Sequence, residues 1–248
     1  CSRAEAAGIA CRNTPRASSN AVAELAISLL FSCARSISIA GHTMRENKWE
    51  KKAYSKGFEV SGKTVGVIGT GRIGQTVIEH LSGFGCRILA YDIFPKDAVR
   101  QHAEYVDLDT LYAESDIITL HAPALEDNYH MIDETAFSKM KDGVILVNCA
   151  RGQLVDTDGM IRNLSNGKIG FAALDVIEKE LGIYYKDLSG TIIDNPEMAI
   201  LRSFYNVFFS PHTAFYTEEA VANMVENSIR GIQAYLKGED HPFIVKKY

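Results

Sequence analysis

The stretch VGVIGTGRIG, residues 65–74, constrains the possible fold more than any other part of the chain. An apolar run leads into Gly69, Gly71 and Gly74, which have the spacing G-x-G-x-x-G, and a helix-forming segment follows. In such a turn the first glycine permits the tight bend, the second lets a ligand approach the backbone, and the third lets the helix pack on its sheet. Phosphate groups bind well at the helix N-terminus that follows. The stretch therefore predicts a strand, turn and helix that bind the pyrophosphate of a dinucleotide.

Apolar runs recur along the chain and alternate with segments of helix length. They are continuously apolar, which is typical of strands covered on both faces of a parallel sheet. We expect strands at residues 64–69, 87–92, 116–122, 143–150, 170–176 and 206–210, and helices at 72–84, 108–114, 134–140 and 156–164. This alternation predicts an α/β fold with a doubly wound parallel sheet.

A long helix is expected before the first strand. Residues 18–20 (SSN) are favourable N-caps, and the apolar pattern continues to about Arg35. The apolar stretch 21–40 contains Glu24 and several serines, which favours a buried helix over a membrane span.

A second long helix is expected near the C-terminus. It should begin near Thr217, with two glutamates in its first turn where the helix dipole favours acids, and end at Gly238. The segment 181–205 is less regular and is expected to be a surface excursion, in which EMAILRS is compatible with a short helix.

Charge and cysteine content exclude several classes of function. The net charge of −5 gives no reason to expect binding to nucleic acid or to an anionic membrane. The cysteines are odd in number, widely spread and without a CxxC pair, which favours free thiols in a reducing compartment over a disulfide framework or a zinc site. They are Cys1, Cys11, Cys33, Cys86 and Cys149. We therefore expect a cytoplasmic protein with no metal site.

Asp92 ends the second expected strand, 18 residues beyond Gly74. A carboxylate near this position bonds the adenosine ribose hydroxyls in dinucleotide-binding folds, and it would repel the 2′-phosphate of NADP. Asp92 therefore favours NAD, although Lys96 leaves NADP open. The alternative is a glycine turn in an α/β fold that binds no nucleotide, and the order of strand, glycines, helix and acid argues against it.

Ionisable side chains follow the ends of three further expected strands. Arg151 lies in VNCARGQLVD, Asp175, Glu178 and Glu180 lie in ALDVIEKE, and His212 lies in FFSPHTA. Open α/β sheets bind ligands beyond the carboxyl ends of their strands, so we expect these groups to converge on one site. Without these other residues, a histidine at a strand end such as His212 is more often a buried structural imidazole than a catalytic acid. Cys149 has no base beside it in the motif, which makes it a strand-end filler rather than a nucleophile.

These segments resemble the D-isomer-specific 2-hydroxyacid dehydrogenase family. The resemblance covers nearly the whole chain and is carried, in the family's order, by NAVAELAISLL, VGVIGTGRIGQ, DIITLHAP, MKDGVILVNCARGQLVD, AALDVIEKE and SPHTAFYTEEAVANMV. The phrases YDIF and YTEEAVANMVE are most similar to the branch that acts on D-lactate, D-2-hydroxyisocaproate and aromatic analogues.

The resemblance implies the roles of the ionisable residues. Arg151 would hold the substrate carboxylate and carbonyl, for which a guanidinium fork is suited. His212 would give its proton to the carbonyl oxygen during hydride transfer. Glu180 would orient the imidazole and favour its protonated form. Glu178 is instead expected to face solvent.

The resemblance also implies further contacts to the cofactor. They come from Arg72 and Ile73 at the pyrophosphate, Asp175 near the nicotinamide amide, Ala150, and His121, for which a structural role at a strand end is equally open. The remaining histidines have no motif and are expected at the surface: His42, His80, His102, His130 and His241.

Family members carry a flavodoxin-like substrate domain before the first long helix, and AEAAGIACRNTP resembles its end. We therefore expect a remnant of that domain at 1–15, an NAD-binding domain at 16–214 and a returning helix at 215–248. Most of the substrate domain would be missing, so this chain alone should bind NAD(H) and turn over poorly.

One position departs from the family pattern. Related sequences often have an aromatic residue where Ala17 stands in PRASS. Phe215 and Tyr216 are expected either to line the substrate pocket in its place or to belong to the core.

The sequence thus predicts an NAD-dependent dehydrogenase that reduces pyruvate or a larger aliphatic or aromatic 2-oxo acid to the D-2-hydroxy acid. The first long helix, apolar on several faces, also suggests a homodimer. Two alternatives remain open: a related dehydrogenase for hydroxyglutarate or phosphoglycerate, and a non-catalytic, NAD(H)-sensing protein similar to a corepressor.

Overall fold

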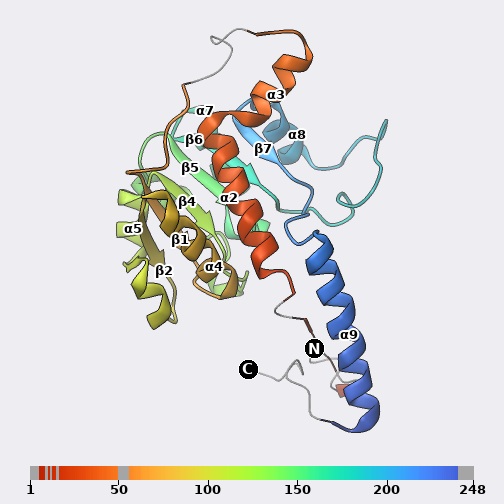
Figure 1. The fold of residues 1–248 in the computed structure, drawn as a ribbon. Helices are drawn as coiled ribbons and strands as arrows, with labels where there is room; N and C mark the ends of the chain where they lie inside the picture. The colour runs from red at the N-terminus through yellow and green to blue at the C-terminus, as the bar shows by residue number, and fades with distance from the viewer. Residues whose placement is uncertain (1–5, 9–10, 12, 15–16, 50–55, 240–248) are drawn as a thin grey trace. The chain divides into compact units, whose positions relative to one another are not determined.

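The computed structural model describes residues 6–8, 11, 13–14, 17–49 and 56–239 (Figure 1). Contacts divide the chain into two compact units, one formed by Val22–Ala214 and the other by Cys1–Ala21 with Phe215–Tyr248. The assignment of residues 1–15 and 215–248 to a substrate domain stays a prediction.

A parallel sheet forms the centre of the unit Val22–Ala214. Within the described residues its strands are β1 (Thr64–Ile68), β2 (Arg87–Tyr91), β3 (Glu104–Tyr105), β4 (Ile117–Leu120), β5 (Val144–Asn148), β6 (Ile169–Leu174) and β7 (Val207–Phe209). Their order is β3-β2-β1-β4-β5-β6-β7. The predicted doubly wound fold and its six strands are confirmed, and the edge strand β3, of two residues, is an addition.

The order of the strands reverses at β1, which lies between β2 and β4. Ile68 pairs with Leu120, Leu120 with Asn148, Asn148 with Leu174, and Leu174 with Phe209. The carboxyl ends of five neighbouring strands therefore form one row. Ligands of open α/β sheets bind beyond such a row, at the point where the strand order reverses.

Helices cover both faces of the sheet (Figure 1). On one face α2 (Ser19–Arg35) and α4 (Arg72–Leu81) pack on side chains such as Ile145 and Val147. On the other, α5 (Leu108–Glu114), α6 (Glu134–Lys139), α7 (Thr157–Ser165) and α8 (Pro196–Ser203) pack on side chains such as Leu146. Since neighbouring strand residues point to opposite faces, two buried faces require the continuously apolar strands of the sequence.

Short polar residues begin several of these helices. Asp107, Asp133 and Asn195 accept hydrogen bonds from the N–H groups of Thr110, Ala136 and Met198 at the starts of α5, α6 and α8. In the other unit Thr217 caps α9 (Glu218–Lys237), which ends at Gly238 with φ 68°. Helix α4 (Arg72–Leu81) differs, because its N-cap residue is Gly71, which provides no side-chain cap. Short 3-10 helices occur at Ser82–Phe84, Asp97–Gln101, Glu126–Asn128 and Gly152–Leu154.

The first long helix ends at Arg35 as predicted, but a second helix that the sequence analysis missed follows it. Ser36 has φ 50°, and α3 (Ile37–Arg45) then continues at 65° to α2. Among the described helices, none is by itself long and apolar enough to cross a membrane, although the bent pair meets that test by length and composition when both are counted together. Residues of α2 such as Ala23, Leu30 and Cys33 are buried in the core.

Candidate active site

The glycine turn joins the end of β1 to the start of α4. Gly69 has φ 93°, and a Cβ atom there would lie 2.5 Å from the backbone nitrogen of Ala122. A Cβ atom at Gly74 would lie 1.9 Å from the carbonyl oxygen of Gly69. By contrast, a Cβ atom at Gly71 would meet nothing within 4 Å. Two of the glycines are therefore required by packing, and the third leaves open space at an uncapped helix start, as a pyrophosphate needs.

The side chains next to this turn differ in their environment. Arg72 is exposed at the start of α4, whereas Ile73 packs partly into the core under the helix. Asp92 follows β2, and its carboxylate accepts hydrogen bonds from the backbone nitrogen of Thr70 (2.6 Å) and of Phe94 (2.8 Å). The acid predicted to recognise ribose therefore touches the glycine turn itself.

His121 lies behind the turn, at the end of β4. Its Nε2 atom is 2.9 Å from the hydroxyl of Thr119, and its backbone nitrogen donates to Ile68. Burial lowers the pKa of His121 to about 3, so the ring is neutral. Its Nδ1 atom is buried and has no hydrogen-bond partner among the described residues. The ring fits a structural role, and its contact with a cofactor stays a prediction.

His212 and Glu180 form a hydrogen-bonded pair. Nδ1 of His212 is 2.6 Å from Oε1 of Glu180, and both side chains are partly buried. The second oxygen of Glu180 accepts the backbone N–H of Ile177 at 3.1 Å, which fixes the carboxylate. A ring held in this way through Nδ1 has Nε2 left for proton exchange with a substrate.

The backbone around His212 is held by Asp175, which is buried at the end of β6. The carboxylate of Asp175 accepts from the hydroxyl of Ser210 (2.6 Å) and from the backbone nitrogens of Thr213 (2.9 Å) and Ala214 (3.0 Å). His212 itself has φ 54°, and its N–H donates to the Asp175 carbonyl. Asp175 thus stabilises the loop that carries His212, while its contact with nicotinamide stays a prediction.

Arg151 follows β5 in a segment fixed by the side chain of Asn148. That amide accepts the N–H of Ala150, which is buried, and donates to the carbonyl of Arg151. The guanidinium donates to the carbonyl of Ala150 at 2.6 Å and is exposed. At Gly152 a Cβ atom would lie 2.1 Å from the carbonyl carbon of Ile177. The Arg151 segment therefore packs directly on the segment that leads to Glu180.

Glu178 does not face solvent, which corrects the expectation from the sequence. Its carboxylate accepts from the hydroxyl of Thr157 (2.7 Å) and of Tyr129 (3.2 Å), and it pairs with Nε2 of His130 (2.9 Å). Burial opposes the charge, but the hydrogen bonds from His130 and Thr157 still lower the pKa of Glu178. His130 is therefore hydrogen-bonded to Glu178 and is not a free surface residue.

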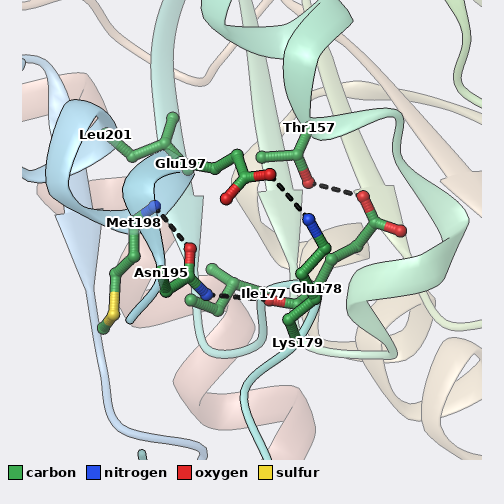
Figure 2. A pocket seen from close by; sticks show the side chains of 8 residues that line it. All are labelled: Thr157, Ile177, Glu178, Lys179, Asn195, Glu197, Met198 and Leu201. Atoms are coloured by element: carbon green, nitrogen blue, oxygen red, sulfur yellow. Dashed lines mark hydrogen bonds and ion pairs between the residues drawn. The ribbon is translucent and has the colours of Figure 1, made fainter. Parts of the chain in front are cut away.

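A small pocket adjoins Glu178. Figure 2 shows Thr157 and Glu178 on one side of it, and Lys179 reaching across to Glu197 from α8 (2.6 Å). Asn195, which caps α8, also donates to the carbonyl of Glu178. These contacts tie the strand-end segment that contains Glu180 to its neighbouring helices.

Two tyrosines that the sequence analysis missed lie beside His212. The hydroxyl of Tyr185 donates to the carbonyl of His212 at 2.5 Å. The ring of Tyr184 meets the imidazole edge-on, with 6.5 Å between ring centroids. Both belong to the irregular segment 181–205, in which no motif marked them. In the sequence, the signal that could have indicated them is that two aromatic residues are adjacent.

Cys149 is buried beside Arg151, and burial raises the pKa of its thiol, as expected of a packing residue. Phe215 and Tyr216, whose rings contact each other edge-on, belong to the other unit, as does the buried Ala17. A role for Phe215 and Tyr216 in substrate binding therefore stays a prediction.

Comparison with known families decides the wider assignment. Residues 27–214 match the model of the D-isomer specific 2-hydroxyacid dehydrogenase NAD binding domain. The chain belongs to this family. This D-2-hydroxyacid dehydrogenase is accordingly an NAD-dependent oxidoreductase, and the predictions of its family, enzyme class and cofactor are confirmed.

Individual relatives support the same assignment. The dehydrogenase is 45% identical over 233 residues to an aromatic 2-oxoacid reductase of Clostridium sporogenes, a match that covers 93% of this chain and 70% of the relative. Its fold matches a D-lactate dehydrogenase from Treponema pallidum with a TM-score of 0.90 at 36% identity, covering 98% of this chain and 74% of that one. It also matches D-lactate dehydrogenase with NAD⁺ from Lactobacillus jensenii, with a TM-score of 0.87, 33% identity and coverage of 98% and 74%.

Proposed function

We propose that this dehydrogenase reduces pyruvate or a larger aliphatic or aromatic 2-oxo acid to the corresponding D-2-hydroxy acid. Bound NADH supplies a hydride to the carbonyl carbon of the substrate. A proton must reach the carbonyl oxygen in the same reaction, so that the C=O group becomes CH–OH. The residues at the strand ends are suited to supply that proton and to hold the acid.

His212 is the proton donor in this proposal. Its Nδ1 atom is bound to Glu180, so its Nε2–H is available to the carbonyl oxygen. Glu180 balances the charge of the imidazolium and keeps the ring in one orientation. When His212 has given up its proton it is neutral, and in the reverse direction it takes the hydroxyl proton as a base.

Arg151 binds the carboxylate of the substrate. A guanidinium presents paired N–H donors that match the two oxygens of a planar anion. The fixed backbone between Asn148 and Gly152 gives this long side chain a defined origin, and its exposure leaves the fork accessible. The packing of Gly152 on Ile177 sets the distance from this origin to the Glu180 segment.

The single observation that carries the proposal is the 2.6 Å pair of His212 and Glu180 on the same edge of the sheet as the glycine turn. His121 on the same edge is by contrast buried and neutral, and its Nδ1 atom has no partner among the described residues, which fits a structural role. The similarity to an aromatic 2-oxoacid reductase and to D-lactate dehydrogenases supports the substrate class.

The test is NADH oxidation by the purified full-length protein with pyruvate, 4-methyl-2-oxopentanoate, phenylpyruvate and 2-oxoglutarate. We expect turnover with at least one of the first three acids, and a product of D configuration by chiral chromatography. A preference for 2-oxoglutarate would move the assignment to a hydroxyglutarate dehydrogenase. NADH binding without turnover of any 2-oxo acid would contradict the proposal.

We further propose that the protein is a homodimer of the cytoplasm. The cysteines of the described residues (Cys11, Cys33, Cys86 and Cys149) are free thiols, which supports a reducing compartment. Burial raises the pKa of Cys33 to about 12, so its thiol is inert within α2. Sedimentation equilibrium reports the number of subunits directly.

A further inference from the structure

We propose that Tyr105, a residue outside every motif, is a positioning residue of the cofactor site that strengthens the preference for NAD over NADP. The inference rests on the proposed dehydrogenase function only in that a dinucleotide binds at the glycine turn. It concerns this chain's own hydrogen bonds around Asp92 and can be measured without any substrate.

Tyr105 lies in the edge strand β3 and joins two segments that hold Asp92. Its hydroxyl is 2.7 Å from the hydroxyl of Thr70 in the glycine turn. It also accepts the backbone N–H of Lys96, at 2.9 Å, from the segment that follows Asp92. Thr70 is fully buried and Tyr105 is half-buried, so the bond between their hydroxyls is partly shielded from water, whereas the bond from Lys96 is exposed.

The direction of each hydrogen bond follows from counting protons. A hydroxyl has one proton to donate. Thr70 donates its proton to Oδ2 of Asp92, at 3.1 Å, so the bond between Thr70 and Tyr105 must take its proton from Tyr105. The order of donation is therefore Lys96 N–H to Tyr105, Tyr105 to Thr70, and Thr70 to Asp92. Hydrogen bonds directed in one sense along a chain strengthen one another.

This order leaves Asp92 with one defined acceptor position. A carboxylate has about four lone-pair sites. Thr70 fills two at Oδ2 with its backbone N–H and its hydroxyl, and Phe94 fills one at Oδ1 with its N–H. One site remains, on Oδ1, and a ribose 2′-hydroxyl is a donor that fits it. The 2′-phosphate of NADP brings negative charge and no such donor, so a rigidly held carboxylate disfavours it.

Two cations lie near Asp92 and would favour NADPH if its carboxylate were free to move. Lys96 lies four residues after Asp92, and the guanidinium of Arg100 lies 5.0 Å from the centre of the Tyr105 ring. Either cation would attract a 2′-phosphate if Asp92 turned away. Tyr105 limits that motion, because it ties both the glycine turn and the backbone of Lys96 to one hydroxyl.

The experiment measures the dissociation constants of NADH and NADPH without substrate, by quenching of protein fluorescence or by calorimetry. In Tyr105→Phe we expect NADH binding to weaken roughly three- to tenfold, the range for a hydrogen bond between two neutral hydroxyls. NADPH binding should stay within about twofold or improve. The dissociation constant of NADPH divided by that of NADH therefore falls.

Tyr112→Phe is the matched control. It also removes one tyrosine hydroxyl, which belongs to a buried residue and donates to the carbonyl of Met131 away from the glycine turn. Both variants should lower the melting temperature of the cofactor-free protein by similar amounts. Only Tyr105→Phe should change the ratio, so an unchanged ratio in Tyr105→Phe would overturn the proposal and assign Tyr105 a purely structural role.

A double-mutant cycle tests the coupling itself. Thr70→Val removes the hydroxyl that links Tyr105 to Asp92, and combined with Tyr105→Phe it should weaken NADH binding no more than the stronger single variant. Additive losses would contradict the chain of hydrogen bonds. Equal binding of NADH and NADPH by the unaltered protein would also contradict the proposal, without touching the dehydrogenase assignment, which turnover of 2-oxo acids tests separately.

Discussion

Two histidines at the strand ends differ in what surrounds their rings, and the difference separates structure from chemistry. His121 is buried against the hydroxyl of Thr119 and has no charged partner in the part of the chain that the structure describes, and burial holds its pKa far below the usual value. His212 instead pairs with a carboxylate and keeps part of its side chain exposed. Sequence alone gives both the same position after a strand, so the distinction comes from their neighbours.

The environment of His121 predicts a pH dependence of stability. The folded protein keeps this ring neutral down to a pKa of about 3, whereas the unfolded chain binds a proton near pH 6.5. The contribution of His121 is therefore complete above pH 6.5 and is lost progressively as pH falls towards 3, by up to about 1.4 kcal/mol per pH unit.

Urea unfolding of the wild type and of His121→Gln at several values between pH 7.5 and pH 4.5 measures this contribution. The plot of unfolding free energy against pH should be less steep in the variant, by up to about 1.4 kcal/mol per pH unit, which corresponds to one proton bound on unfolding. His102→Gln, at an exposed histidine, should retain the slope of the wild type. Identical slopes in wild type and His121→Gln would refute the buried, neutral ring.

At the scale of elements, the glycine turn shows how packing and binding can be separated. Gly69 and Gly74 contact each other and the backbone after β4, so they set how closely α4 approaches the sheet. Gly71 makes no such contact and leaves the start of α4 open. The motif is thus made of two structural glycines and one that serves the ligand.

Two alanine substitutions test this division. Gly74→Ala forces a methyl group against the carbonyl of Gly69 and should lower the unfolding free energy by about 1–3 kcal/mol, together with NADH affinity. Gly71 has φ −64°, which alanine also adopts, and a methyl group there would lie in open space. The unfolding free energy of Gly71→Ala should therefore stay within about 0.5 kcal/mol of the wild-type value. Its new methyl group should nevertheless weaken NADH binding by about tenfold or more. If both variants lost stability alike, the separation would be wrong.

At the scale of the whole molecule, the sequence predicts the sheet well because its strands are buried on both faces. Such strands are continuously apolar, and all six of the predicted ones form. Strand β3 has two residues at the edge of the sheet and carries too little pattern to be found. Helix α3 was missed because the left-handed backbone of Ser36, which redirects the chain, is not encoded by a glycine.

The candidate site was predicted in part for a related reason. Its central residues follow strand ends within recognisable motifs, and a parallel sheet brings those ends together. The residues that hold them pair across long stretches of chain, as His130 does with Glu178 and Tyr105 with Thr70. No local pattern announces such pairs, so only the structure reveals them.

The most direct test of the account compares His212→Gln with the wild type, using the 2-oxo acid that the wild type reduces best. Glutamine retains a polar side chain near Glu180 but cannot deliver a proton as an imidazolium does. We expect kcat to fall by about 10²–10⁴-fold while the dissociation constant of NADH stays within about twofold. A variant that kept kcat within about tenfold of the wild type would contradict the role of His212 as the acid.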